Sequence, residues 1–294
     1  MSSTEGPPGG FRLMGILNVT PDSFSDGGLY LETDLAVAQG ARLVDEGADI
    51  VDVGGESTRP GAEPVSAAEE LHRVLAVIEA LAAFDWDPAH VAHPARPQIS
   101  IDTSKAPVAE AALGAGASLV NDVSAFRSDP EMAGLVASSG AECCLMHMRG
   151  EPRTMQLDPA YGDVVDEVRA FLEERLEFAV REGVSERRVM LDPGIGFGKT
   201  VEHNLELIRR LGELRTLGRP IVIGTSRKSF LGRIGGEGQG DRLGGTVASN
   251  VLAFERGASV FRVHEVAPVR EALAVAAATL GERWLQGNTR IQTS

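Results

Sequence analysis

One pattern recurs eight times along the 294 residues of this chain: an apolar run rich in β-branched residues, a polar or glycine-rich turn, and then a stretch of helical periodicity. Continuous apolar runs predict strands that are buried on both faces, as the strands of parallel sheets are. The expected strands cover residues 13–19, 50–54, 98–102, 119–123, 142–147, 189–192, 221–224 and 260–263.

Helices are expected between these strands. Gly-Ala pairs precede four of the strands, at residues 47–48, 116–117, 140–141 and 257–258, and such a pair fits a helix C-cap followed by a strand start. The expected helices cover residues 34–46, 66–83, 106–115, 130–139, 164–182, 202–211, 243–255 and 268–280.

Eight strand–helix units in about 270 residues are the count and spacing of a single (β/α)8 TIM barrel, an α/β fold. The alternative, a doubly wound sheet, has fewer strands and carries its phosphate loop after the first of them. We therefore expect a disordered N-terminal lead-in over residues 1–11, one barrel domain over residues 12–282, and a C-terminal tail over residues 283–294.

Composition excludes several classes of partner. Lys and Arg number 28 and Asp and Glu 42, a net charge of −14, which argues against nucleic-acid binding and against docking on an anionic membrane. The sequence has neither a long apolar run nor the features of a signal peptide. The adjacent Cys143 and Cys144 point to opposite faces of a strand and predict no disulfide framework or zinc site, so we expect a reducing cytoplasm.

Polar residues gather where the expected strands end, and that edge of a barrel carries the chemistry. A single Asp or Asn there is as easily a cap or a turn residue, and His147 is as easily structural. Polar residues at eight successive strand ends make a functional interpretation the better one. They are Asn18, Arg59, Asp102, Asn121, His147, Asp192, Lys228, Arg262 and His264.

These residue types suit a flat heterocycle that carries a phosphate or diphosphate group. The cationic and imidazole side chains can bind the anion, and the amide oxygen of Asn18 suits Mg²⁺ when phosphates supply the other ligands. Asp102 and Asp192 can each accept two parallel N–H groups from a ring edge, and Asn121 can both donate and accept.

Three other motifs are not supported. Residues 193–200 resemble a phosphate-binding P-loop, but Pro193 replaces its first glycine. The sequence shows no dinucleotide fingerprint after the first expected strand. It also lacks the paired histidines of a zinc hydrolase.

Seven segments together resemble the dihydropteroate synthase family, from the first expected strand to the last. Glu265 stands where the family commonly has Asp, and the loop over residues 85–97 is longer than usual. The segments are LNVTPDSFSDGG (17–28), GGESTRPGA (54–62), SIDTSK (100–105), NDV (121–123), LDPGIGFGK (191–199), TSRKSFLG (225–232) and RVHEV (262–266).

The resemblance implies a cytoplasmic, homodimeric transferase of folate biosynthesis that uses Mg²⁺. It would join 4-aminobenzoate to (7,8-dihydropterin-6-yl)methyl diphosphate by an SN1-like step, with release of pyrophosphate. The resemblance assigns catalysis to Lys228, Arg262, Asp102 and His264. It assigns the pterin to Asp102, Asn121, Asp192, Lys228, Arg262, Met146, Phe197 and Gly224, the aminobenzoate to Thr58, Arg59, Pro60, Phe24 and Ser229, the diphosphate to Asn18, Arg59, Arg262 and His264, and the metal to Asn18.

Alternatives remain within the same scaffold. A methyltetrahydrofolate-dependent methyltransferase domain would share the pterin carboxylates, but it has no need of Arg59, His264 or the segment 17–28. A non-catalytic pterin-binding paralogue and a generic phosphate-binding barrel enzyme are the others.

Overall fold

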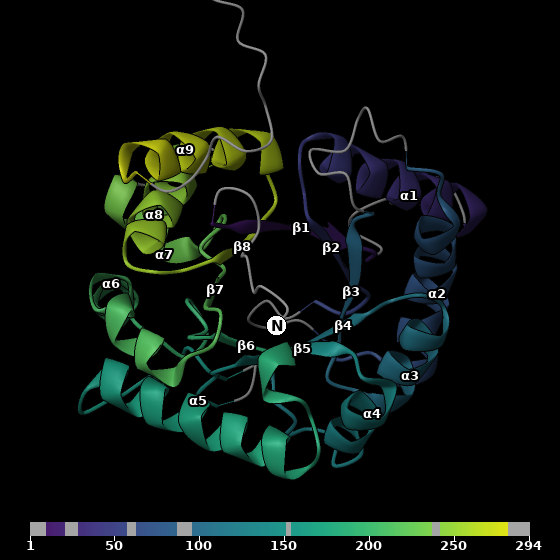
Figure 1. Cartoon of the computed structure of the whole chain (residues 1–294), viewed down its shortest axis with the longest axis horizontal. Helices are drawn as coiled ribbons and strands as arrows, with labels where there is room; N and C mark the ends of the chain where they lie inside the picture. Colours follow the sequence, from purple (N-terminus) through teal and green to yellow (C-terminus); the bar gives the residue numbers. More distant parts are fainter. Residues whose placement is uncertain are drawn as a thin grey trace, which may run out of the picture.

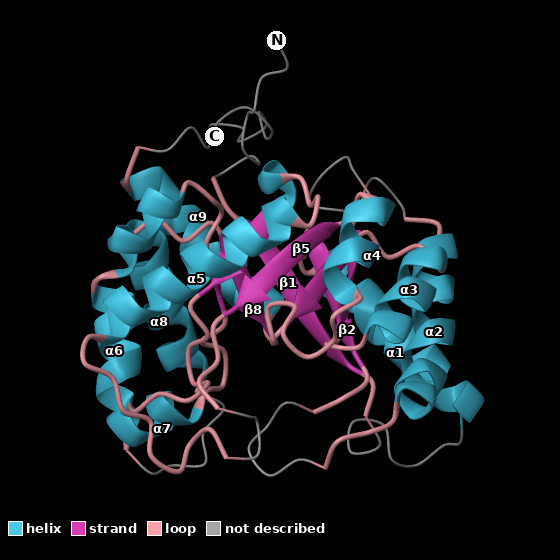
Figure 2. Cartoon of the chain, turned by 90° about the horizontal axis from the view of Figure 1, so that it is seen from below, coloured by secondary structure: helices cyan, strands magenta, loops and turns pink. Residues whose placement is uncertain are grey.

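The computed structural model describes residues 10–20, 29–57, 63–86, 96–150, 154–236 and 242–281. Its strands form one parallel sheet in the order β6-β5-β4-β3-β2-β1-β8-β7, and an isolated bridge between Leu191 and Ile221 joins the two ends. The helices surround the strands (Figures 1 and 2). The (β/α)8 barrel is therefore confirmed.

The strands lie close to their expected positions. Strand β7 is two residues shorter than expected and pairs with β8 over two residues, and β4 and β5 each end one residue before the expected position. The strands are β1 (Arg12–Asn18), β2 (Ile50–Gly54), β3 (Gln98–Asp102), β4 (Leu119–Asp122), β5 (Glu142–Met146), β6 (Val189–Asp192), β7 (Val222–Ile223) and β8 (Val260–Val263).

The helices differ from expectation in two places. Helix α1 begins five positions earlier than the expected residue 34, and a short additional helix, α7, follows β7. The helices are α1 (Leu29–Asp45), α2 (Ala67–Ala83), α3 (Ala106–Gly114), α4 (Met132–Ser139), α5 (Val164–Arg181), α6 (Val201–Arg209), α7 (Ser229–Gly235), α8 (Leu243–Glu255) and α9 (Val266–Thr279), with 3-10 turns at Glu186–Arg188 and Leu211–Leu217.

Alternation along the strands builds two apolar layers. Cys143 belongs to the large cluster between strands and helices, whereas Cys144 belongs to a second cluster, and both cysteines are buried and free. Because neighbouring strand residues point to opposite faces, the second cluster fills the barrel interior. It consists of Met14, Ile50, Leu119, Cys144, Met190, Val222 and Val260.

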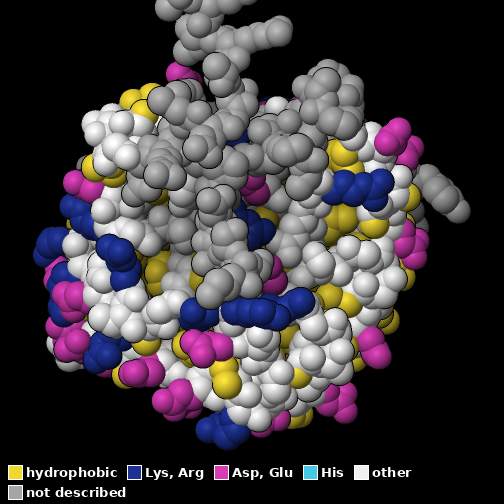
Figure 3. Space-filling view, viewed as in Figure 1, with side chains coloured by type: hydrophobic (Ala, Val, Ile, Leu, Met, Phe, Trp, Pro, Cys, Tyr) yellow, Lys and Arg dark blue, Asp and Glu magenta, His cyan; other side chains and the backbone are white. Residues whose placement is uncertain are grey.

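The chain ends were assigned to a lead-in and a tail, and residues 1–9 and 282–294 lie outside the described residues. That division stays a prediction, although Phe11 is buried, with its ring edge-on to Phe254 and Phe261. Among the described helices, none is both long and apolar enough to span a membrane. On the face seen in Figure 3, basic and acidic side chains are interspersed.

Candidate active site

The site residues lie two positions further along the strands than the apolar residues that fill the barrel interior. Side chains two positions apart in a strand point to the same face of the sheet. The positions two residues beyond six members of the inner cluster therefore face the same interior, nearer the carboxyl ends of the strands. They are Asp52, Asn121, Met146, Asp192, Gly224 and Arg262.

A row of residues crosses four neighbouring strands at the mouth. The register pairs Asn18 with Gly54, Gly54 with Asp102, and Asp102 with Asn121. Because Gly54 has no side chain, its neighbours approach each other: a Cβ there would lie 3.7 Å from Asp102 Oδ2 and 3.9 Å from Asn18 Oδ1. The structure thus brings three predicted site residues together.

Arg262 on β8 binds two carboxylates, one from β2 and one from β3. Its Nε donates to Asp52 Oδ2 and its Nη2 to Asp102 Oδ2, each at 2.6 Å. Asn121 Nδ2 also donates to Asp52 Oδ2, at 3.0 Å. Charge-assisted bonds of this length are the strong ones, so the guanidinium is fixed in place.

Asp52 is the functional residue that sequence reasoning missed. It is fully buried and connects Arg262 to Asn121, while its Oδ1 has no hydrogen-bond partner among the described residues. Its signal was available, because Asp52 is the single charged residue inside the apolar run 50–54. A buried charge in such a run needs a partner.

Burial raises the pKa values of two carboxyl groups in the site. Desolvation outweighs the opposing charge of Arg262 and raises the pKa of Asp102 to about 7, with Asp52 acting in the same direction. Desolvation also raises the pKa of Asp192, although that carboxylate accepts from Gly194 N at 2.6 Å and lies near cations. At a pKa of about 7, Asp102 exchanges a proton near neutral pH.

Lys228 supplies a second cation at the mouth of the barrel. Its Nζ lies 3.9 Å from the centre of the Phe197 ring, a cation–π contact, and Phe197 packs in a small cluster with Met146. Burial lowers the pKa of Lys228 to about 8, and the charge of Arg262 adds to that effect.

A tight turn aims the residues that follow β7. Arg227 adopts φ 57°, an uncommon conformation for a residue with a side chain, and its guanidinium pairs with Glu265. Beside it, Ser226 Oγ lies 2.9 Å from Nδ1 of His264 and accepts from His264 N at 3.2 Å. This arrangement orients the imidazole, places Lys228 at the N-cap of α7 and puts Ser229 at the exposed first position of that helix.

A cluster of charges, which we call the neck cluster, pins the segment after β2. It consists of Glu56, Glu70 and Lys105. Lys105 Nζ donates to both carboxylates at 2.5 Å, and the second oxygen of Glu56 accepts from Val65 N at 3.2 Å. Glu56 thereby ties the two ends of the segment 56–65 together.

Four predicted site residues, Phe24, Thr58, Arg59 and Pro60, lie outside the described residues. Among the residues that the structure describes, no group of three or more acidic, histidine or cysteine side chains could hold a metal ion. Asn18 offers one neutral oxygen. That donor set fits Mg²⁺, which takes one or two protein ligands when substrate phosphates complete its coordination.

Comparisons with known proteins agree with this geometry. Residues 14–264 match the family of pterin binding enzymes. Dihydropteroate synthase of Escherichia coli K12 is 42% identical over 274 residues, 92% of this chain and 93% of that protein.

Solved structures are similar as well. Dihydropteroate synthase of Xanthomonas albilineans with 4-aminobenzoic acid matches with a TM-score of 0.83 and 45% identity, over 92% of this chain and 93% of that chain. Its complex with 7,8-dihydropteroate matches with a TM-score of 0.80 and 42% identity, over 92% and 94%.

Proposed function

Because the chain belongs to the pterin-binding enzyme family and acts as a dihydropteroate synthase, we propose that the pocket between Asp102, Asp192, Lys228 and Arg262 is where it condenses its substrates. The observation that carries this assignment is the pair of hydrogen bonds that Arg262 donates, one to Asp52 and one to Asp102. It joins the carboxylate side of the pocket to the cationic side.

The dihydropterin ring is held at the carboxylate side. Asp192 and Asn121 present an acceptor and an amide to the N–H edge of the ring, and Asp102 faces the same interior. Carboxylates bind paired N–H donors in a planar fork, which selects a heterocycle with adjacent donors. Met146, Phe197 and Gly224 line the remaining wall.

The diphosphate leaves at the cationic side. Arg262 and His264 stabilise the negative charge that develops as the C–O bond breaks, and Asn18 would hold Mg²⁺ through its side-chain oxygen. The ion, when bound, supplies further neutralisation of the leaving group. Asp102 faces the delocalised pterin cation that remains, which favours departure before attack, the SN1-like course.

The second substrate meets the residues after β7. Ser229 and Lys228 would bind the carboxylate of 4-aminobenzoate, together with Phe24, Thr58, Arg59 and Pro60. The amine of 4-aminobenzoate is neutral at pH 7, so its lone pair attacks the cation without a general base from the protein.

The test is pyrophosphate release by the purified chain, supplied with the dihydropterin methyl diphosphate, 4-aminobenzoate and Mg²⁺. Under steady-state conditions we expect release that needs both the amine and the ion. Omission of the amine should stop turnover, because the nucleophile is missing, and EDTA should lower the rate at least ~100-fold, the size of one lost transition-state contact. Release that continues without the amine would indicate a hydrolase. Binding of the pterin without any release would indicate a non-catalytic paralogue.

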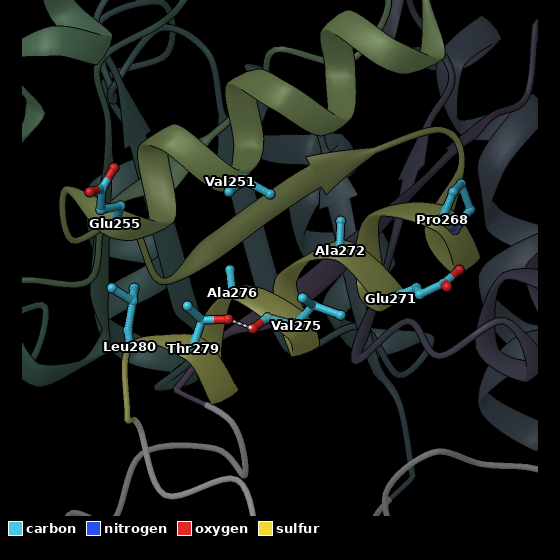
Figure 4. A pocket seen from close by; sticks show the side chains of 9 residues that line it. All are labelled: Val251, Glu255, Pro268, Glu271, Ala272, Val275, Ala276, Thr279 and Leu280. Atoms are coloured by element: carbon cyan, nitrogen blue, oxygen red, sulfur yellow. Dashed lines mark hydrogen bonds between the residues drawn. The ribbon is translucent and has the colours of Figure 1, made fainter.

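The homodimer that we propose forms through α8 and α9. A groove between these helices is lined by apolar side chains, including Val251, Ala272, Val275 and Leu280, with Glu255 and Glu271 at its ends (Figure 4). Val275 is 64% exposed and Leu280 52%. A contiguous apolar patch of this kind, rimmed by acidic groups, suits a second copy of the same helices.

Val275→Glu should convert the dimer to a monomer, because it places a charge at the centre of that patch. Light scattering after gel filtration would measure the mass, and we expect the unmodified chain to run at twice the mass of the variant. Val180→Glu, at a 41% exposed valine on α5, is the matched control. A monomeric unmodified chain at micromolar concentration would contradict the dimer.

The cytoplasm is the compartment that we propose. Cys143 and Cys144 are buried and free, and burial raises the pKa of both thiols well above the usual range. Such thiols are unreactive structural residues, which suits a reducing compartment.

A further inference from the structure

The proposed reaction leaves one buried cation of the barrel mouth without a role. Lys199, in the loop after β6, is 3% exposed. Its Nζ lies 2.9 Å from His147 Nδ1, 3.0 Å from the carbonyl oxygen of Phe197 and 3.5 Å from that of His147. Among the described residues, its hydrogen-bond partners are thus three neutral acceptors and no carboxylate.

This arrangement favours a neutral His147 and a protonated Lys199. Burial lowers the pKa of His147 to about 2, and the charges of Lys199 and Arg127 act in the same direction, so the ring is neutral. Nδ1 then accepts, and the proton sits on Nε2. Burial lowers the pKa of Lys199 to about 7, but a lysine that donates to three acceptors is using all three N–H groups of an ammonium.

Lys199 lies where the backbone of the loop after β6 contacts the backbone at the end of β5. A Cβ on Gly194 would lie 1.8 Å from the carbonyl oxygen of His147, and one on Gly198, at φ 63°, would lie 2.4 Å from that of Arg149. His147 N also donates to the carbonyl of Asp192 at 2.9 Å. The loop after β6 is therefore seated against the end of β5, and Lys199 bonds to both.

The same loop contains Phe197, which contacts Lys228. The Phe197 carbonyl accepts from Lys199, while the Phe197 ring supports the ammonium of Lys228. His147 is packed from behind by the edge of Phe171, whose ring centre lies 4.8 Å away. A rigid chain of contacts thus runs from β5 to the side chains that face the pterin.

We propose that Lys199 and His147 act as a pair of positioning residues, which hold Phe197 and through it Lys228 in place for the dihydropterin substrate. The inference rests on the proposed function, because Lys228 and Phe197 are assigned to substrate there. Neither Lys199 nor His147 touches the reacting atoms. Both act through the loop after β6, so their loss should weaken pterin binding more than turnover.

The experiment compares Lys199→Met, His147→Phe and the double variant with the unmodified chain. We expect each single change to raise KM for the dihydropterin diphosphate about tenfold, with kcat and KM for 4-aminobenzoate within about threefold. The double variant should be no worse than the worse single variant, because both changes break the same bond. Arg209→Met, which removes a 67% exposed cation from α6, is the control and should leave both KM values unchanged.

A pH profile separates positioning from a merely structural role. Asp192 faces Lys228, Arg262 and Lys199, and the charge of each lowers the pKa of its carboxyl group. Loss of Lys199 should therefore move the acid limb of kcat/KM to higher pH. Unchanged KM values with a lowered unfolding temperature, or additive effects in the double variant, would overturn the inference. Absence of turnover by the unmodified chain would instead count against the proposed function.

Discussion

Arg262→Met is expected to lower kcat/KM by at least ~100-fold, since loss of one preorganised donor to a developing oxyanion costs 10²–10³ in rate. Its guanidinium bonds to Asp52 and Asp102 at 2.6 Å, and we propose that it stabilises the leaving diphosphate. The variant therefore loses leaving-group stabilisation and leaves two buried carboxylates without their counter-ion. Steady-state rates of pyrophosphate release would measure the loss.

The same variant should change the pH dependence. Asp102 has a pKa of about 7 even though Arg262 lowers it. Activity that needs the ionised carboxylate is lost as pH falls through that value. Without the guanidinium the pKa rises further, so the midpoint of the acid limb should move to higher pH.

Two further variants make the Arg262 result interpretable. Arg262→Lys keeps the charge but not the planar fork, and should fall between the parent and Arg262→Met. Arg42→Met removes an exposed cation from α1 and should have no effect on rate. A near-normal rate for Arg262→Met in a folded protein would show that Arg262 does not stabilise the leaving group.

Lys105→Met should destabilise the barrel by about 3–5 kcal/mol, the cost of breaking a buried ion pair from one side. Glu70 is fully buried on α2, and its second oxygen has no hydrogen-bond partner among the described residues. Lys105 provides its charge compensation at 2.5 Å. At roughly 2–4 °C per kcal/mol for a barrel of this size, the unfolding midpoint should fall by about 10 °C.

A compensating change distinguishes this explanation from simple loss of packing. Lys105→Met combined with Glu70→Gln removes both buried charges, and should recover at least half of the lost stability. Arg42→Met breaks an exposed pair with Glu46 and should shift the midpoint by about 1–2 °C at most. A midpoint for Lys105→Met within 2 °C of the parent would show that the Lys105–Glu70 ion pair does not stabilise the fold.

Sequence patterns predict the features of this molecule that depend on neighbouring residues, above all its strands. The strands from residue 50 to 54 and from residue 98 to 102 were predicted to the residue, because apolar runs and flanking turns define them. Helical periodicity does not mark helix α7, because it has only seven residues, two of them glycine. Without periodicity over a longer window, no pattern marks such a helix.

The missed part of the site is the part that only folding assembles. Asp52 bonds to Arg262 across a sequence separation of 210 residues, and neither residue carries a local sign of the other. Lys105 and Lys199 follow the ends of β3 and β6 in the sequence, but their partners Glu70 and His147 come from other strand–helix units. Pairings of this kind follow from barrel closure, which sequence periodicity predicts only as a topology.

The row of Asn18, Gly54, Asp102 and Asn121 has a consequence for how such a chain can change over evolutionary time. The side chains meet because four strands hold one hydrogen-bond register. Insertion or deletion of a single residue within a strand would turn every later side chain to the other face, so that a carboxylate would enter the layer beneath the helices. Substitution can vary these strands, and length variation is confined to the loops between them.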